Sequence, residues 1–194
     1  MTDDKALLRR FVQSFECFDN LEAFESDPHA SALAVNGLDE RGFGRWRPSQ
    51  TTLGRDSLEA LYAVLPFKLP SLYEQLILSY RWAEVDLVGY RLLANPPGED
   101  LLGLLEEMRR DRIIFSTLVR HGYTQFAKGE DIDYDPVCFD GRRRTRDSDC
   151  AIVKLDHEGI LCHERVTIVK ELAPSFRELV NQTIAAPRNK KTSR

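Results

Sequence analysis

The order of predicted elements indicates an α+β fold, with a central twisted, mainly antiparallel sheet flanked by helices and an N-terminal helical extension. Helical patterns come first along the 194-residue chain, strand patterns gather in its second half, and one more helix closes it. This order lacks the strict strand–helix alternation of a doubly wound parallel sheet. The clearest packing unit is the C-terminal third, where two apolar strand patterns precede an amphipathic helix that can cover them.

Residues 3–24 are predicted to form an amphipathic helix, and Thr2 or Asp3 can cap its start. Its apolar stripe consists of Leu7, Leu8, Phe11, Val12, Phe15, Phe18 and Leu21. Because this apolar stripe is broad, it must pack on the rest of the chain or on a second subunit. A homodimer formed through this helix is therefore one of two alternatives. Residues 26–53 are rich in Gly and Pro turn signals and mark the expected boundary of the extension.

The middle of the chain alternates between helical and strand patterns. We expect helices over residues 56–65, 70–80 and 100–121, the last with a break near Asp111, and strands over residues 85–93 and 123–127. Pro70 suits the first turn of a helix, and Gly122 suits a helix end. We therefore divide the chain into an N-terminal extension (1–44), a main domain (45–184) and a disordered basic tail (185–194).

The C-terminal unit is predicted to be two strands and a closing helix. We expect strands over residues 137–139 and 150–155, a turn at Asp140-Gly141 between them and a turn over residues 156–159 after them. Pro174 opens the helix, which shows apolar residues at helical spacing. One shared core is expected to contain Phe139, Ile152, Val153, Leu155, Phe176 and Leu179.

These segments carry a resemblance to a known family. Asp-Pro-Val-Cys-Phe-Asp (135–140), Ala-Ile-Val-Lys-Leu-Asp-His-Glu (151–158) and Ala-Pro-Ser-Phe-Arg-Glu-Leu-Val (173–180) resemble the second half of a SUKH domain. The Leu-Pro at 69–70 is similar to the start of that family's leading helix, so the resemblance covers about residues 45–184. One departure is Arg81-Trp82-Ala83, which stands where many members have a Gly-rich turn, so the surface there is expected to differ.

The resemblance implies a sheet flanked by helices and a function in protein binding. The superfamily includes fungal cell-wall-assembly regulators and bacterial immunity proteins, which neutralise a cognate toxin, often a nuclease, by masking it. The resemblance therefore implies no catalytic residues and no cofactor. A fungal-type scaffold is disfavoured because the chain lacks long disordered arms.

Composition predicts a cytoplasmic protein. The first residues, Met-Thr-Asp-Asp-Lys, provide neither the basic nor the apolar region of a secretory signal, and no apolar run is long enough to span a membrane. The four cysteines are widely spaced. Cys138 and Cys150 fall in adjacent strand patterns, where a disulfide is conceivable but a reducing compartment favours free thiols.

Charge favours a basic protein partner over nucleic acid. All 31 acidic residues but only 23 of the 27 Lys and Arg lie in residues 1–184, which therefore carry −8. Such a field attracts a basic surface and repels phosphates. The internal basic run, Arg142-Arg143-Arg144 with Arg146, lies among acids, so we interpret it as an exposed hairpin tip rather than a nucleic-acid contact.

The acidic run before the C-terminal unit is the expected contact surface. It consists of Glu130, Asp131, Asp133 and Asp135, and Tyr134 within it is an aromatic residue of a type enriched at interface hot spots. A basic partner could relieve the repulsion among these carboxylates. The surface around Trp82 is the next choice.

The alternative function is a metal-dependent hydrolase that uses the acidic residues 130–135 or Asp156-His157-Glu158. The spacing of the acids does not fit an EF-hand, and Asp is also common in turns. Consecutive strand residues point to opposite faces, so Asp156, His157 and Glu158 cannot all converge on one atom. Zinc binding by His157, Cys162 and His163 lacks a fourth ligand at zinc-finger spacing.

Overall fold

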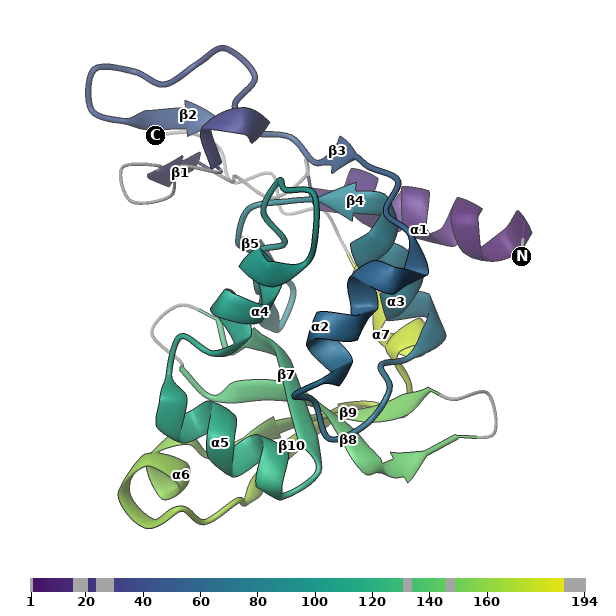
Figure 1. The fold of residues 1–194 in the computed structure, drawn as a ribbon, viewed down its shortest axis with the longest axis vertical. Coiled ribbons are helices and arrows are strands. Elements are labelled where there is room, and N and C mark those ends of the chain that lie inside the picture. The colour runs from purple at the N-terminus through teal and green to yellow at the C-terminus, as the bar shows by residue number, and fades with distance from the viewer. Residues whose placement is uncertain (1, 16–20, 24–29, 131–133, 146–148, 187–194) are drawn as a thin grey trace.

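The computed structural model describes residues 2–15, 21–23, 30–130, 134–145 and 149–186, and it has the predicted α+β fold (Figure 1). In chain order its elements are α1 (Thr2–Ser14), β1 (Leu21–Ala23), the 3-10 helix η2 (Ala30–Leu33), β2 (Phe43–Arg45), β3 (Ser49–Gln50), the 3-10 helix η3 (Arg55–Leu58), α2 (Glu59–Tyr62), α3 (Ser71–Ser79), β4 (Tyr80–Arg81), β5 (Val85–Leu87), β6 (Tyr90–Leu92), α4 (Leu102–Met108), α5 (Arg112–Arg120), β7 (Tyr123–Lys128), β8 (Pro136–Arg144), β9 (Cys150–Leu155), α6 (His157–His163), β10 (Ile168–Ala173) and α7 (Phe176–Ala185).

The main sheet is antiparallel and has six strands in the order β10-β9-β8-β7-β6-β5. Each of its strands therefore pairs with the next strand along the chain, a pattern that short connections favour. The described residues also form two small antiparallel sheets, β1–β2 and β3–β4.

The N-terminal helix and one strand are shorter than predicted. Helix α1 ends at Ser14, and residues 21–23 form a strand that pairs with β2; Phe18, which the predicted stripe included, lies outside the described residues. The predicted strand over residues 85–93 is a tight hairpin, β5–β6. Gly89, with φ +89°, supplies the left-handed conformation that this turn needs.

The C-terminal unit also differs from the prediction in three places. Asp140-Gly141 is not a turn, because β8 runs through it to Arg144. The expected turn over residues 156–159 is the start of α6, and Asp156 caps that helix by accepting a hydrogen bond from the Gly159 N–H at 3.1 Å. Strand β10 was not predicted, because most of its residues are exposed and it has no clear apolar alternation.

One face of the sheet packs on α7 through aromatic rings. Phe139 of β8 lies directly opposite Ile152 of β9, and both are fully buried against fully buried Phe176 at the start of α7. The centroid of the Phe176 ring lies 5.2–6.4 Å from those of Phe11, Tyr73, Phe126 and Phe139. This face therefore joins α1, α3, β7, β8 and α7 in one hydrophobic cluster.

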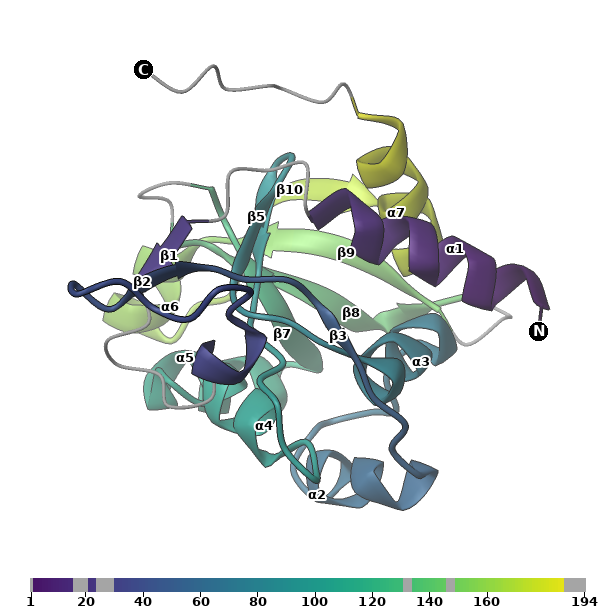
Figure 2. The ribbon, with the colours of Figure 1, turned by 90° about the horizontal axis from the view of Figure 1, so that it is seen from above.

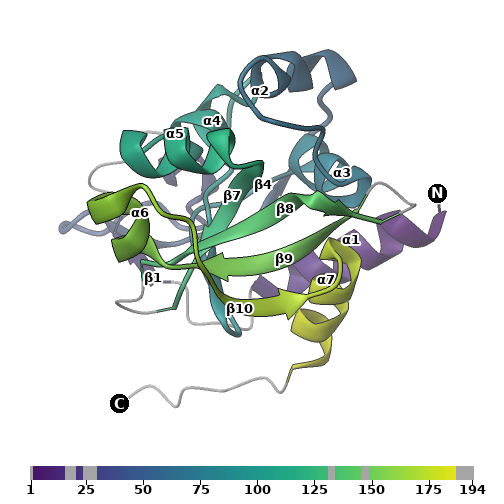
Figure 3. The same ribbon diagram turned by 90° about the horizontal axis from the view of Figure 1, so that it is seen from below.

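The opposite face forms a second, smaller cluster, so the prediction of one shared core was wrong. Val153 and Leu155 pack with Leu118 of α5 and Ile160 of α6, because alternate strand residues point to opposite faces. Figure 3 shows α5 and α6 side by side next to the strands. Cys138 belongs to this cluster and Cys150 to the first, and both are buried free thiols.

Helix α1 packs within the chain. The side chains of Leu8, Phe11 and Phe15 are buried, and Phe11 contacts Phe176 of α7. Figure 2 shows α1 lying beside α7, and Arg177 of α7 donates a hydrogen bond to the Asp4 carboxylate at 2.7 Å. The described side chains of the predicted stripe, those of Leu7, Leu8, Phe11, Val12 and Phe15, are thus covered within one chain.

Contacts cross both predicted domain boundaries. Pairing of β1 with β2 reaches Arg45, and Leu33 and Trp46 belong to the same hydrophobic cluster as α1. At the other end, Ala185 completes α7 rather than starting a tail; residues 187–194 of the predicted tail lie outside the described residues. The extension and the main domain therefore share a core.

We expect Phe176→Ala to lower the free energy of unfolding by about 3–5 kcal/mol, because the substitution leaves a cavity among four rings. Chemical denaturation measures this. The control is Tyr134→Ala, which removes an aromatic ring that is 62% exposed and should change stability by about 0.5 kcal/mol or less. Equal, small effects would contradict the packing of α7 on the sheet.

The ion pair between α1 and α7 should depend on pH. Hydrogen bonding to Arg177 lowers the pKa of Asp4 below its ordinary value of 3.8. The stabilisation is therefore present above 3.8 and is lost as the pH falls through the folded-state pKa. The difference in unfolding free energy between wild type and Asp4→Asn should shrink on acidification, and a difference independent of pH would refute the pairing.

Candidate protein-binding surface

Three connections meet at one end of the main sheet. The β5–β6 turn precedes β6, whose residue Arg91 lies opposite Lys128 at the end of β7. Val137, at the start of β8, lies opposite Lys154 near the end of β9. The β5–β6 turn, the β7–β8 loop and the start of α6 are therefore neighbours, because antiparallel pairing places them at the same edge.

The β7–β8 loop is closed at its base and held on one flank by the β5–β6 turn. The Gly129 N–H donates a hydrogen bond to the carbonyl of Asp135 at 2.9 Å. The Glu130 carboxylate accepts a hydrogen bond from the backbone N–H of Gly89. These two contacts fix where the loop leaves and rejoins the sheet.

Asp135 holds the other flank of the loop on α6. One of its carboxylate oxygens accepts hydrogen bonds from the backbone N–H of His157 at 3.0 Å and from its ring Nδ1 at 2.8 Å. The Lys154 ammonium lies 4.0 Å from the other oxygen. The Asp135 side chain is 16% exposed, so it anchors the loop and offers little surface to a partner, in contrast to the sequence prediction.

Tyr134 is the exposed aromatic residue of this loop, as its predicted role in binding requires. Its side chain is 62% exposed, and its ring stands edge-on to the His157 ring with the centroids 6.3 Å apart. Glu158, next to His157 in the first turn of α6, is also exposed. Asp131 and Asp133 lie outside the described residues. We call Glu130, Tyr134 and Glu158 the loop surface.

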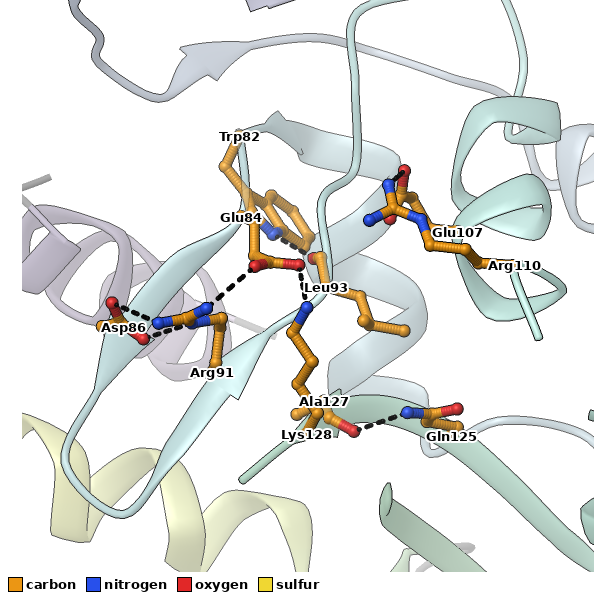
Figure 4. Close-up of polar contacts among 10 residues, drawn as sticks. All are labelled: Trp82, Glu84, Asp86, Arg91, Leu93, Glu107, Arg110, Gln125, Ala127 and Lys128. Carbon is orange, nitrogen blue, oxygen red and sulfur yellow. Dashed lines mark hydrogen bonds and ion pairs between the residues drawn. The ribbon is translucent and has the colours of Figure 1, made fainter. Parts of the chain in front are cut away.

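A row of four charged residues covers the adjoining hairpin (Figure 4). Arg91 contacts Asp86, its cross-strand partner, through two hydrogen bonds of 2.5 and 3.1 Å. Glu84 lies between two cations, 2.8 Å from Lys128 and 3.5 Å from Arg91. Because two acids face two bases, the row is neutral and adds little to long-range attraction.

The sequence prediction that Trp82 contacts a partner was wrong. Its side chain is fully buried, and its indole N–H donates a hydrogen bond to the carbonyl of Leu93 at 2.8 Å. Arg81, which is also buried, donates to the carbonyls of Gly98 and Asp100 at 3.2 and 2.9 Å. The segment that departs from the SUKH pattern is therefore part of the core.

The side chains of Asp156, His157 and Glu158 lie in three different environments. Asp156 caps α6, the His157 ring bonds to Asp135, and Glu158 is exposed in the first turn. The described part of the chain contains no group of three or more His, Cys, Asp or Glu placed to hold a metal ion. Hence no described feature favours the metal-dependent hydrolase.

Other acids of the C-terminal unit have structural partners. Asp149 accepts hydrogen bonds from the backbone N–H groups of Phe176 and Arg177 at 2.9 and 3.2 Å and so caps α7 together with Ser175. Asp140 is fully buried and holds Arg142 at 3.0 Å.

Two arginines of the internal basic run are paired with acids, as the predicted neutralisation requires. The Arg142 guanidinium lies over the Tyr123 ring and pairs with Asp140. Arg143 contacts Glu171 of β10 at 2.5 and 3.1 Å. Arg146 lies outside the described residues.

Sequence reasoning missed the residues that position the loop. His157 and Lys154 were not expected to approach Asp135, because the hydrogen-bonded pair is 22 residues apart in sequence. The pairing of β8 with β9 brings them together. In the observed register Lys154 lies opposite Val137, two residues after Asp135.

Comparison with models of known protein families gave no match, and comparison with curated protein sequences gave none either. The resemblance to the SUKH superfamily therefore stays a prediction. Within the described ranges, no helix combines the length and the apolar character needed to cross a membrane.

We expect Asp135→Ala to lower the free energy of unfolding by about 1–3 kcal/mol, because two N–H groups of His157 lose their acceptor. Asp135→Asn keeps an oxygen acceptor and should cost less than half as much. Chemical denaturation of both variants measures the difference. Equal losses would mean that the hydrogen bonds to His157 do not hold the loop.

Proposed function

We propose that this chain is a non-enzymatic protein-binding module, an immunity-type protein that neutralises a cognate bacterial toxin by masking it. The observation that carries the proposal is Tyr134, a large aromatic side chain exposed on a loop whose base and flanks are hydrogen-bonded. The α+β fold and the sequence resemblance to SUKH immunity proteins support the same class.

The anchoring of the loop favours binding. A side chain on a positioned loop loses less conformational freedom when a partner covers it than one on an unrestrained loop. Tyrosine adds a large contact area with few rotatable bonds and a hydroxyl that can reach a polar group. These properties support Tyr134 as the proposed central anchor of the interface.

Charge supports a basic partner, such as the substrate-binding face of a nuclease. Residues 1–184 carry a net charge of −8. Two exposed acidic residues of the loop surface, Glu130 and Glu158, accompany Tyr134. The negative electrostatic field of this charge accelerates the encounter with a basic surface and repels the phosphates of nucleic acid. A cytoplasmic location is part of the proposal, and the buried free thiols Cys138 and Cys150 are compatible with a reducing compartment.

Purification of the tagged protein from its own host tests the proposal. We expect a basic protein to co-purify in stoichiometric amount, and we expect its toxic activity to fall in proportion as this chain is added. A co-purified protein whose activity is unchanged by saturating amounts of this chain would contradict neutralisation.

For that isolated partner, Tyr134→Ala should raise the dissociation constant about 30-fold, which corresponds to a hot spot of about 2 kcal/mol. Surface plasmon resonance measures the constants. The control is Val35→Ala, which removes an apolar side chain that is 44% exposed in the segment before β2. Figure 1 shows β2 far from α6, so this change should have less than about a twofold effect. Equal losses would remove Tyr134 from the interface.

Charge reversal of Asp131 and Asp133 to Lys should slow association with that partner, and most strongly at low salt. Asp135 is left unchanged, because its carboxylate holds the loop on α6. Stopped-flow measurements at several salt concentrations give the rates. Unchanged rates at low salt would show that the acidic run does not steer the encounter.

A further inference from the structure

A polar pocket of about 340 Å³ lies between α1, the β3–β4 segment and the end of α3, away from the loop surface. Its lining consists of Lys5, Leu8, Arg9, Gln50, Thr51, Thr52, Gln75, Ser79 and Tyr80. This volume is at the lower end of the range for small-molecule sites. In Figure 1, α1 lies beside β4 and α3, which form the opposing wall.

The pocket is basic, although the protein as a whole is acidic. Lys5 and Arg9 are one helical turn apart on α1, so they lie on the same face of the helix. Both side chains are exposed, and within the described residues neither has an acidic partner. Of the two acids in the first turn of α1, Asp3 and Asp4, the carboxylate of Asp4 is paired with Arg177 of α7. The two cations are thus left for a ligand.

The opposing wall supplies hydroxyl and amide groups on ordered backbone. The Thr51 N–H donates a hydrogen bond to the carbonyl of Ser79 at 2.9 Å, and Gln50 pairs with Tyr80 in the small β3–β4 sheet. The hydroxyls of Thr51, Thr52 and Ser79 can each donate a hydrogen bond. Leu8 and the Tyr80 ring add apolar surface.

We propose that this pocket binds a small phosphorylated molecule, with Lys5 and Arg9 holding the phosphate and the hydroxyls of the opposite wall completing its hydrogen bonds. A phosphate monoester carries a charge of about −1.5 to −2 at neutral pH, which matches two cations better than a single carboxylate does. Its three terminal oxygens are also enough acceptors for both cations and a hydroxyl. The pocket volume leaves room for a small organic group.

Titration with inorganic phosphate and with adenosine 5′-monophosphate, followed by NMR of the ¹⁵N-labelled protein, tests the site. Saturable shifts of the Thr51, Thr52 and Ser79 amides at millimolar concentrations are expected from both probes. Adenosine, which has no phosphate, serves as the uncharged control and should cause no such shifts. Absence of saturable shifts with both phosphorylated probes would overturn the proposal.

Two variants with the same loss of charge give the sharper comparison. Arg9→Gln should weaken binding of adenosine 5′-monophosphate about tenfold, because a charge-assisted hydrogen bond is lost. Arg10→Gln removes an adjacent exposed arginine that does not line the pocket and should change affinity less than about twofold. Equal weakening in both variants would show attraction by overall charge and would overturn the site. NMR spectra of the free variants that differ from the wild-type spectrum only near the substituted residue verify that both fold.

Discussion

Packing of the Phe176 ring against four other aromatic rings holds distant parts of the chain together in one core. The rings come from α1, α3, β7, β8 and α7, which are spread over most of the chain. Aromatic pairs in such edge-on geometry add to the burial of their surfaces. The cluster also buries the Tyr73 hydroxyl, which has no hydrogen-bond partner in the described structure, and burial raises the pKa of this tyrosine. The apolar contacts must offset that cost.

The position of the candidate binding surface follows from the order of the strands. Since neighbouring strands of the sheet are also neighbours in sequence, the β5–β6 turn, the β7–β8 loop and the start of α6 meet at one edge. Glu130 and Asp135 use this proximity to fasten the loop, which leaves Tyr134 exposed between them. The two described carboxylates of this acidic run therefore hold the loop in place.

Much of the fold could be predicted from sequence where the apolar residues of a segment recur at either helical or strand spacing alone. The helix break at Asp111 was predicted, and this residue caps α5 through the N–H groups of Ile113 and Ile114. Strand β10 was not predicted, because an exposed edge strand has no buried face to impose alternation. The β5–β6 hairpin looked like one strand because its turn is very short.

The candidate site could be predicted only in part. An aromatic residue among acids indicated a contact, and Tyr134 is exposed as expected. The roles of Asp135 and Trp82 depend on distant partners, His157 in one case and Leu93 in the other, that no local pattern reveals. A side chain that the sequence predicts to be exposed can therefore hold the fold together when strand pairing brings a hydrogen-bond donor or acceptor next to it.

Hydrogen–deuterium exchange of the chain alone and in complex with its co-purified partner shows whether the β7–β8 loop and the start of α6 bind that partner. We expect slower exchange on binding at the amides of residues 130–135 and 157–158, with α1 and the pocket beside it unchanged. Protection confined to other elements, with unchanged exchange in the β7–β8 loop, would contradict this expectation.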